Sequence, residues 1–513
     1  MYFEKKTKKH KLFSEVTTKQ IIVKIVHLFH APNCTTTFPS IPTLFSLQNS
    51  NRPDFTRTLA AASGMLLDYC CCFGGRSSGD VADHDPVLLV SGIAGSILHS
   101  KKKILGISYE TRVWVRFLLA DLEFRRELWA LYNPETGYAE PLEKGIEIVV
   151  PQDDHGLYAI DILDPSLIVK LVHLSEVYHF HDMIDMLVGC GYEKGTTLFG
   201  YGYDFRQSNR IHKAMNGLKE KLDAAYKASG GRKVNIISHS MGGLLVSCFM
   251  YLHKDVFAKY VNKWITIATP FQGAPGCIND SLLTGLQFVD GFESNFFVSR
   301  WTMHQLLVEC PSIYEMLPNP GFRWEKQPKI QVWRQKSENE ESSVVLESYG
   351  PSESVKLFDE ALKQNELNYD GKNVAIPFNF SILQWAEGTR EILNYAQLPE
   401  GVSFYNIYGT SYDTPFDVCY GSETSPICEI SDVCHTMPKY SYVDGDGTVP
   451  TESAQADNFK AVERVGIDAS HRGLLCDKKV FETIQKWLGV APLKVKLQTR
   501  TSKVIDACSN CDS

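Results

Sequence analysis

The chain has 513 residues, of which 44% are hydrophobic and 22% are charged, values that are ordinary for a globular protein. Its net charge of −8 argues against a nucleic-acid-binding protein, because such proteins carry clustered lysine and arginine on the binding face. No uninterrupted apolar run approaches the roughly 18 residues that a membrane-spanning helix needs, so we expect any membrane contact to be peripheral.

The first 84 residues differ in composition from the rest of the chain. Lysines crowd the start, acidic residues are few, and serine and threonine are frequent. This composition is typical of an organellar transit peptide or of an unstructured arm, and a third interpretation is that translation naturally begins at Met65. We expect 1–84 to be a poorly ordered, dispensable arm that ends in the linker Phe73–Asp80. The adjacent cysteines at 70–72 are either palmitoylation sites or unmodified thiols.

Short apolar runs alternate with helical patterns from Pro86 onward. The runs are apolar on both faces and lie at 86–90, 197–200, 234–237, 264–268 and 404–408. Such strands are typical of a parallel sheet that helices cover, and segments 211–227 and 244–253 have the apolar spacing of covering helices. The alternation predicts an α/β fold over residues 85–490.

Two long segments, 101–195 and 271–402, interrupt this alternation. Each is too long to be a simple loop, so we expect each to be an insertion packed over the edge of the sheet. The first is predicted to be a lid or membrane-binding insertion and the second a cap insertion. Residues 491–513 are expected to form a C-terminal tail.

The stretch IISHSMGGLLV at 236–246 places Ser240 between an apolar strand and an apolar helix. A strand that turns tightly into a helix strains its middle residue and needs small neighbours two positions away on each side, usually as G-x-S-x-G. Here those neighbours are Ser238 and Gly242, and serine is small enough to preserve the turn. The pattern predicts a nucleophilic serine.

A serine nucleophile needs a histidine base, and the base needs an acid that fixes its tautomer. In this architecture the acid and then the histidine follow the serine along the chain. The glycine-rich turn YVDGDGTVP at 442–450 offers the acid, and His471 follows another short strand. Asp446 is preferred because Gly-x-Val-Pro follows it, and Asp444 is the second choice. The alternative is that both aspartates only stabilise a turn and that His471 is a surface residue.

Two backbone N–H groups normally bind the oxyanion that forms during such a reaction. One belongs to the residue after the nucleophile, Met241, and the other to a residue after the first core strand. In the turn SGIAGS at 91–96, Ile93 is preferred because the glycines beside it let the backbone turn inward. The alternative is an ordinary glycine turn.

Five stretches together resemble the lecithin:cholesterol acyltransferase family: LVSGIAGS at 89–96, YDFR at 203–206, SHSMGG at 238–243, TPFQGAP at 269–275 and DGDGTVP at 444–450. The resemblance covers residues 85–490 and is strongest to the plant branch, whose members resemble phospholipase A(1) or A enzymes more than sterol acylators. It implies an α/β-hydrolase core with a membrane-binding cap and a mobile lid. It also implies release or transfer of a fatty acyl group from a glycerophospholipid, without a metal or other cofactor. Secreted members carry a disulfide in the early lid, whereas 101–140 contains no cysteine, which disfavours secretion.

We therefore expect a phospholipase A(1)-type serine hydrolase that releases a fatty acid from glycerophospholipids such as phosphatidylcholine through an acyl-serine intermediate. The alternatives are an acyltransferase that passes the acyl group to a sterol or diacylglycerol, and an inactive lipid-binding protein. The expected partner is the phospholipid substrate at a membrane surface, with no nucleic acid and no obligate protein partner. We expect a cytoplasmic protein at intracellular membranes, with organellar targeting by 1–84 as the alternative.

Three aromatic residues in the insertions are predicted to contact the substrate or the lipid interface. Trp114 recurs with Leu118 and Leu122 at a spacing of four, which predicts a helical face that either enters the interface or packs in the core. Phe296 and Trp301 carry the same two interpretations, and in the functional one they line the acyl site.

Two polar groups have a structural and a functional interpretation. The first group is His179, His181, Asp182 and Asp185. These residues are either metal ligands or the start of a helix with acids near its positive end, and the helix start is the simpler interpretation. Asp204 and Arg206 are predicted to form a structural ion pair under the active site, with binding of phosphate headgroups as the alternative.

The fourteen cysteines are spaced without the regularity of a disulfide framework. Cys190, Cys248 and Cys310 lie in apolar segments, where reduced, buried thiols are expected. A reducing compartment fits this usage best.

Overall fold

The computed structural model describes residues 84–104, 107–115, 124–166, 177–289, 298–338 and 341–491. Residues 1–83 of the predicted arm and 492–513 of the predicted tail lie outside these ranges, as do Leu118, Leu122 and Phe296. All described residues fall within one compact unit of the chain.

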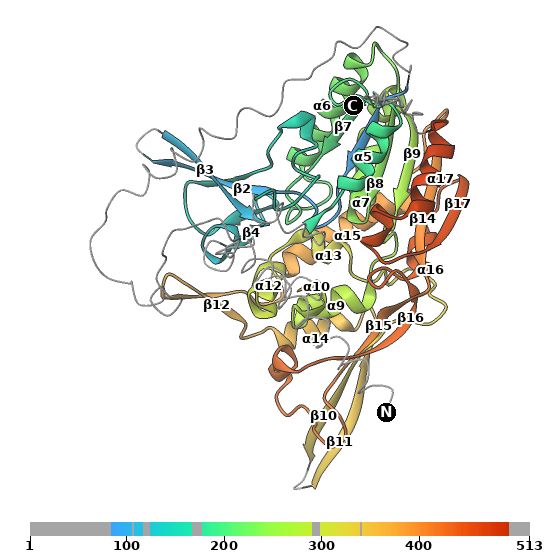
Figure 1. The fold of residues 1–513 in the computed structure, drawn as a ribbon. Helices are drawn as coiled ribbons and strands as arrows, with labels where there is room; N and C mark the ends of the chain where they lie inside the picture. Colours follow the sequence, from blue (N-terminus) through green and yellow to red (C-terminus); the bar gives the residue numbers. More distant parts are fainter. Residues whose placement is uncertain are drawn as a thin grey trace, which may run out of the picture. The chain divides into compact units, whose positions relative to one another are not determined.

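A parallel sheet of six strands forms the centre of this unit (Figure 1). In chain order its strands are β1 (Val87–Val90), β7 (Leu198–Tyr201), β8 (Val234–His239), β9 (Val261–Ile267), β14 (Ser403–Thr410) and β17 (Ala461–Asp468). They lie side by side in the order β17-β14-β9-β8-β1-β7, and every pair is parallel. Every residue of β1, β7 and β8 is buried, which explains why these strands read as continuous apolar runs. The prediction of an α/β fold with a parallel sheet is confirmed.

Helices cover both faces of the central sheet. The apolar faces of α5 (His181–Gly189) and α17 (Lys478–Leu488) join one hydrophobic cluster with Val87 and Leu89 of β1. Three other helices also contact the strands of the central sheet: α6 (His212–Ala228), α7 (Met241–Leu252) and α8 (Lys254–Tyr260). None of their residues belongs to that hydrophobic cluster. Because alternate strand residues point to opposite faces, these three helices cover the other face. The helices predicted at 211–227 and 244–253 correspond to α6 and α7.

The segment 101–195 contains two small antiparallel sheets before α5. One consists of β2 (Leu98–Ile104), β3 (Ile107–Trp114) and β6 (Ile146–Val149), and the other of β4 (Ala130–Asn133) and β5 (Tyr138–Pro141). Short helical turns lie at Phe124–Leu128 and Asp154–Gly156. The sequence predicted a helical face that begins at Trp114. This prediction is wrong for Trp114, because the residue ends β3 and pairs with Leu98 of β2. The β-branched residues that precede it in β3 favour a strand over a helix.

The segment 271–402 folds into helices and two hairpins. Its helices are α9 (Pro275–Leu283), α10 (Leu286–Val289), α12 (Arg300–Leu307), α13 (Pro311–Glu315), α14 (Ser354–Ala361) and α15 (Phe380–Tyr395). Its strands are β10 (Ile330–Glu338), β11 (Glu341–Tyr349), β12 (Glu366–Tyr369) and β13 (Lys372–Ala375). The hairpin of β10 and β11 extends away from the central sheet (Figure 1).

A second sheet joins this segment to the chain that follows it. Its order is β11-β10-β15-β16, where β15 (Tyr412–Tyr420) and β16 (Lys439–Gly445) lie after the predicted end of the insertion at 402. The remaining short helices are Ile430–His435, α16 (Thr451–Gln455) and Gly473–Leu475. Among the described residues, no helix combines the length and apolar character needed to cross a bilayer.

Candidate active site

Ser240 lies on the sharp turn between β8 and α7. Its backbone has φ 53° and ψ −131°, a strained conformation for a residue with a side chain. A Cβ at Gly242 would lie 2.3 Å from the carbonyl oxygen of Ser91, so the turn requires glycine at that position. The hydroxyl of Ser238 accepts a hydrogen bond from the indole nitrogen of Trp264 at 3.0 Å. That bond explains how a serine is accommodated where glycine is usual.

His471 and Asp446 converge on Ser240. The Nε2 atom of His471 lies 2.9 Å from Ser240 Oγ, and its Nδ1 atom lies 2.7 Å from Asp446 Oδ2. A carboxylate only accepts hydrogen bonds, so Nδ1 carries the proton and Nε2 presents its lone pair to the serine hydroxyl. The other carboxylate oxygen, Asp446 Oδ1, accepts from the backbone N–H groups of Thr448 at 2.9 Å and Val449 at 2.7 Å. The acid is thus fixed by three donors and is 1% exposed.

Asp446 reaches the site by a route that the sequence did not indicate. The strand that precedes its turn, β16, belongs to the second sheet and not to the central parallel sheet. Asp446 nevertheless lies against the end of β14, where a Cβ at Gly409 would come within 2.4 Å of Asp446 Cβ. Asp444 is exposed and accepts instead from Ser411 N and Thr451 Oγ1, so it does not contact His471 through its carboxylate.

The two predicted oxyanion donors belong to segments that adjoin Ser240. Met241 is the first residue of α7 and is fully buried, with its N–H at the positive end of the helix. Ile93 lies in the turn after β1, and a Cβ at Gly92 would lie 2.8 Å from Ser240 Cβ. This turn therefore passes directly beside the serine.

Hydrogen bonds from Trp114 of the first insertion, from within the turn and from the chain after β7 hold this turn in place. The indole nitrogen of Trp114 donates to the carbonyl oxygen of Ala94 at 2.9 Å, and Ala94 has a positive φ of 57°. The hydroxyls of Ser91 and Ser96 lie 2.7 Å apart, and Ser96 Oγ accepts from the backbone N–H of Tyr203 at 3.1 Å. The turn is thus bonded to β3 and to the segment that follows β7.

The predicted aromatic contact residues have different surroundings. Trp114 is 2% exposed and packs against Phe205, with ring centroids 5.4 Å apart, so it does not present a surface to lipid. Its interpretation as an interface residue is replaced by the interpretation as core. Trp301 is half-buried on α12; its ring stacks on His304 and lies tilted by 41° to His435, with centroids 4.7 Å apart in each pair. Phe296 lies outside the described residues.

The predicted ion pair under the site is present. Arg206 is fully buried and contacts Asp204 through two nitrogens, at 2.9 Å and 2.7 Å, while a third nitrogen donates to the carbonyl oxygen of Leu128. Burial disfavours the charged carboxylate, but the guanidinium outweighs burial and lowers the pKa of Asp204. The guanidinium is thus occupied by protein groups, as a structural role requires.

The group at 179–185 begins a helix. Helix α5 starts at His181, and Asp182 lies in its first turn. The Nδ1 atom of His181 lies 2.6 Å from Asp161 Oδ1, and its Nε2 atom lies 3.8 Å from Asp185 Oδ2. Within the described ranges, no three histidine, cysteine or acidic side chains gather as metal ligands.

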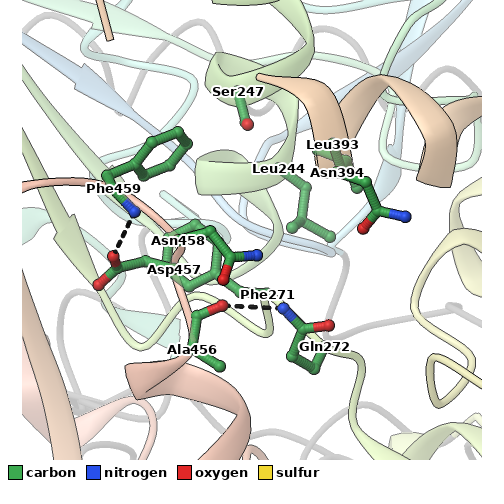
Figure 2. A pocket seen from close by; sticks show the side chains of 10 residues that line it. All are labelled: Leu244, Ser247, Phe271, Gln272, Leu393, Asn394, Ala456, Asp457, Asn458 and Phe459. Carbon is green, nitrogen blue, oxygen red and sulfur yellow. Dashed lines mark hydrogen bonds between the residues drawn. The ribbon is translucent and has the colours of Figure 1, made fainter. Parts of the chain in front are cut away.

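Two cavities lie near these elements. The smaller, of about 10 Å³, lies between α7, α15 and residues 456–459, with Leu244 and Ser247 on its α7 side (Figure 2). Such a volume admits about one water molecule and no acyl chain. The larger, about 1100 Å³, runs along α6 and β6. The side chains of Ser240, His471 and Asp446 line neither cavity.

Sequence reasoning missed three residues that shape the site. Gly409 makes room for Asp446, and two buried histidines, His179 and His239, lie beside the turn after β1. The only available signal was the position of His239 next to Ser240, because the other two contacts join segments far apart in the chain.

The parallel sheet, the strained serine between β8 and α7, and the histidine and aspartate on later turns define an α/β-hydrolase. The model of the family described as Lecithin:cholesterol acyltransferase matches residues 111–467. The chain belongs to this family, which confirms the resemblance drawn from its motifs.

Three curated relatives illustrate the range of similarity. Phospholipase A(1) LCAT3 of Arabidopsis thaliana is 71% identical over 443 residues, which cover 85% of this chain and 99% of the relative. Lecithin-cholesterol acyltransferase-like 4 of Arabidopsis thaliana is 52% identical over 409 residues, which cover 79% of this chain and 76% of the relative. Lysosomal phospholipase A and acyltransferase of Homo sapiens is 24% identical over 396 residues, which cover 72% of this chain and 81% of the relative.

Proposed function

We propose that this chain is a phospholipase A(1)-type serine hydrolase that releases a fatty acid from glycerophospholipids. The observation that carries the proposal is the geometry of Ser240, His471 and Asp446, with 2.9 Å and 2.7 Å between successive partners. The 71% identity to a relative named Phospholipase A(1) supports the substrate class.

The reaction follows from the tautomer of His471. Ser240 Oγ attacks the acyl carbonyl carbon while its proton passes to His471 Nε2, and Asp446 stabilises the imidazolium. The bond from carbon to the glycerol oxygen then breaks, and His471 returns the proton to that oxygen, which releases a lysophospholipid. Water attacks the acyl-serine with His471 again as base, and fatty acid and free Ser240 result.

We assign the oxyanion site to the N–H groups of Met241 and Ile93. Negative charge develops on the carbonyl oxygen in the tetrahedral intermediate, and preorganised N–H donors stabilise it. The N-terminus of α7 supplies the first donor, and the glycine-rich turn beside Ser240 supplies the second.

We further propose that the protein works at a membrane surface, as a cytoplasmic protein bound peripherally to intracellular membranes. The hairpin of β2 and β3 carries two exposed apolar residues, Ile107 at 58% and Tyr109 at 51% exposure, and three consecutive lysines at 101–103. Lys101 lies 3.6 Å from Glu110 and Lys102 lies 2.9 Å from Glu127, so Lys103 is the cation of this group that carries the argument. Cationic and apolar side chains together favour binding to anionic lipid. The first insertion would then face the membrane and the second would cap the site.

Acyl transfer is the second candidate function, because the acyl-serine is common to both reactions and one relative is named for both activities. The test is incubation with phosphatidylcholine labelled separately at each glycerol position, together with a sterol. We expect labelled fatty acid from the sn-1 position. Dominant sterol ester would assign the protein to acyl transfer, and the absence of both products would leave only lipid binding.

A further inference from the structure

Two buried histidines lie under the proposed catalytic centre and have no role in the reaction above. His239 ends β8 directly before Ser240, and His179 lies just before α5. They are 3% and 7% exposed, so both imidazoles belong to the interior. Their rings meet edge to face, with centroids 5.5 Å apart and planes at 70°.

His239 supports the loop that carries His471. Its Nε2 atom lies 3.0 Å from the backbone carbonyl oxygen of His471. Because a carbonyl only accepts, Nε2 carries the proton and donates to it. The backbone N–H of His471 donates to the carbonyl oxygen of Asp446 at 2.8 Å, so both main-chain groups of the proposed base are fixed.

The same two rings lie under the turn that holds Ile93. A Cβ at Gly95 would come within 2.4 Å of His179 Nε2, and a Cβ at Gly92 would come within 3.3 Å of His239 Nδ1. The glycines therefore allow this backbone to rest directly on the imidazoles. Loss of either ring would leave this part of the turn without its packing partner.

His179 also ties the first insertion to the catalytic loop. Its neighbour Tyr178 accepts a hydrogen bond from Arg472, the residue after His471, at 3.3 Å through its carbonyl oxygen. The backbone N–H of His179 donates to the carbonyl oxygen of Asp161 within the insertion. One short segment thus contacts the oxyanion turn, His239 and the loop of the base.

Both rings suit a position beside a group that becomes positively charged. Burial lowers the pKa of His179 to about 3, and burial, with His471 and His179 nearby, lowers the pKa of His239 well below its usual value. The rings of His239 and His471 are 4.8 Å apart, so a charged His239 would oppose formation of the His471 imidazolium. A neutral N–H donor avoids this repulsion.

We propose that His239 and His179 are positioning residues that hold His471 and the oxyanion turn in register with Ser240. They act through the carbonyl oxygen of His471 and through Gly92 and Gly95, not on the substrate. The inference rests on the proposed function of Ser240 and His471. The competing account is that the two rings only fill space in the core.

The test compares His239→Gln and His239→Leu in the full-length protein with a soluble p-nitrophenyl ester. Leucine removes the N–H donor, and we expect kcat to fall about 100-fold with KM nearly unchanged, the loss typical of a displacement of about 1 Å. Glutamine keeps a neutral N–H donor and is expected to restore most of kcat. A space-filling role predicts instead that the two variants lose melting temperature and activity alike.

His179 is tested in the same assay by His179→Phe, which keeps a ring under Gly95, and His179→Ala, which does not. We expect kcat to fall about tenfold in H179A and by a smaller factor in H179F, whose ring still packs against Gly95. His253→Leu, a histidine at the end of α7 outside the site, is the matched control and should change neither kcat nor KM.

The outcomes separate this inference from the proposed function. A wild-type protein that does not hydrolyse the ester would refute the proposed function. An active wild type with folded H239L and H179A variants of unchanged kcat would refute the positioning role. If H239L does not fold, His239→Met, which is close to glutamine in volume but has no N–H donor, replaces it, and equal kcat in folded H239M and H239Q would refute the positioning role.

Discussion

The two aspartates in the turn at 442–450 have opposite surroundings, and this difference gives a test at the scale of single residues. Asp446 is buried and orients His471, whereas Asp444 is exposed and bonds Ser411 and Thr451. In Asp446→Asn the N–H groups of Thr448 and Val449 hold the amide oxygen, so the NH2 group faces His471 Nδ1 and the required tautomer is lost; we expect kcat to fall on the order of 10⁴-fold. Asp444→Asn retains an acceptor oxygen and should leave kcat near the wild-type value. Steady-state kinetics with a soluble ester would contradict the assignment if D444N were the more impaired variant.

Gly409 offers a second test at this scale, because it acts only by lacking a side chain. A Cβ there would lie 2.4 Å from Asp446 Cβ and 3.0 Å from the carbonyl oxygen of Ala469, so Gly409→Ala must displace the acid. We expect a loss in kcat of about 100-fold with little change in KM, since the binding surface is not altered. Gly189→Ala, at an exposed glycine of α5 that has no positive φ and no neighbour within 4 Å of an added Cβ, controls for the change of residue. Equal kcat in the two variants would contradict this account.

At the scale of elements, Glu309 joins three parts of the fold and couples stability to pH. Its Oε2 atom accepts from the backbone N–H of Tyr132 in β4 at 2.8 Å, and Asn379, which caps α15, lies 3.3 Å away. Burial raises the pKa of Glu309 to about 7, above its ordinary value of 4.5. The folded state thus favours the protonated form, whose stabilising contribution is present at low pH and is lost as pH rises from 4.5 to 7.

Glu309→Gln removes this titration, so the variant should gain stability relative to wild type with rising pH. Each pH unit corresponds to about 1.4 kcal/mol, so the free energy of unfolding of E309Q should rise relative to that of the wild type by about 3 kcal/mol between pH 4.5 and 7. Urea denaturation at several pH values measures it. Parallel pH curves for the two proteins would show that Glu309 does not titrate in this range.

The elements of the core were predictable because each is buried on both faces or has a regular apolar spacing. The runs at 86–90 and 234–237 became β1 and β8 for this reason. The insertions were less predictable, because their strands pair across long sequence distances. Trp114 shows this: its spacing of four with Leu118 and Leu122 indicated a helix, but pairing with Leu98 makes it the end of a strand.

The site was predictable to a similar extent. Local turn chemistry and chain order singled out Ser240, Asp446 and His471, whose side chains the structure brings together. The contact of Gly409 with Asp446 and the rings of His179 and His239 depend on tertiary neighbours, which no local pattern contains.

At the scale of the whole molecule, the proposed membrane contact predicts that binding and chemistry can be separated. Ile107→Asp removes an exposed apolar group from the β2–β3 hairpin, and burying an isoleucine side chain is worth about 2 kcal/mol. We expect binding to anionic phosphatidylserine vesicles to weaken about tenfold or more, with unchanged hydrolysis of a soluble ester.

A matched control for this vesicle experiment lies on the central sheet. Val462 of β17 is 63% exposed, close to the 58% of Ile107, but it lies outside the hairpin. Val462→Asp should leave vesicle sedimentation unchanged. Equal effects of the two substitutions would refute the hairpin as the membrane contact.

The central claim is that Ser240 is the nucleophile and that His471 activates it. The most direct measurement is treatment of the full-length protein with a fluorophosphonate, followed by peptide mass analysis to locate the adduct. We predict a single adduct on Ser240 in the wild type, none on that peptide in Ser240→Ala, and greatly slowed labelling in His471→Ala. An adduct on another residue, or labelling of S240A at the wild-type rate, would contradict the account.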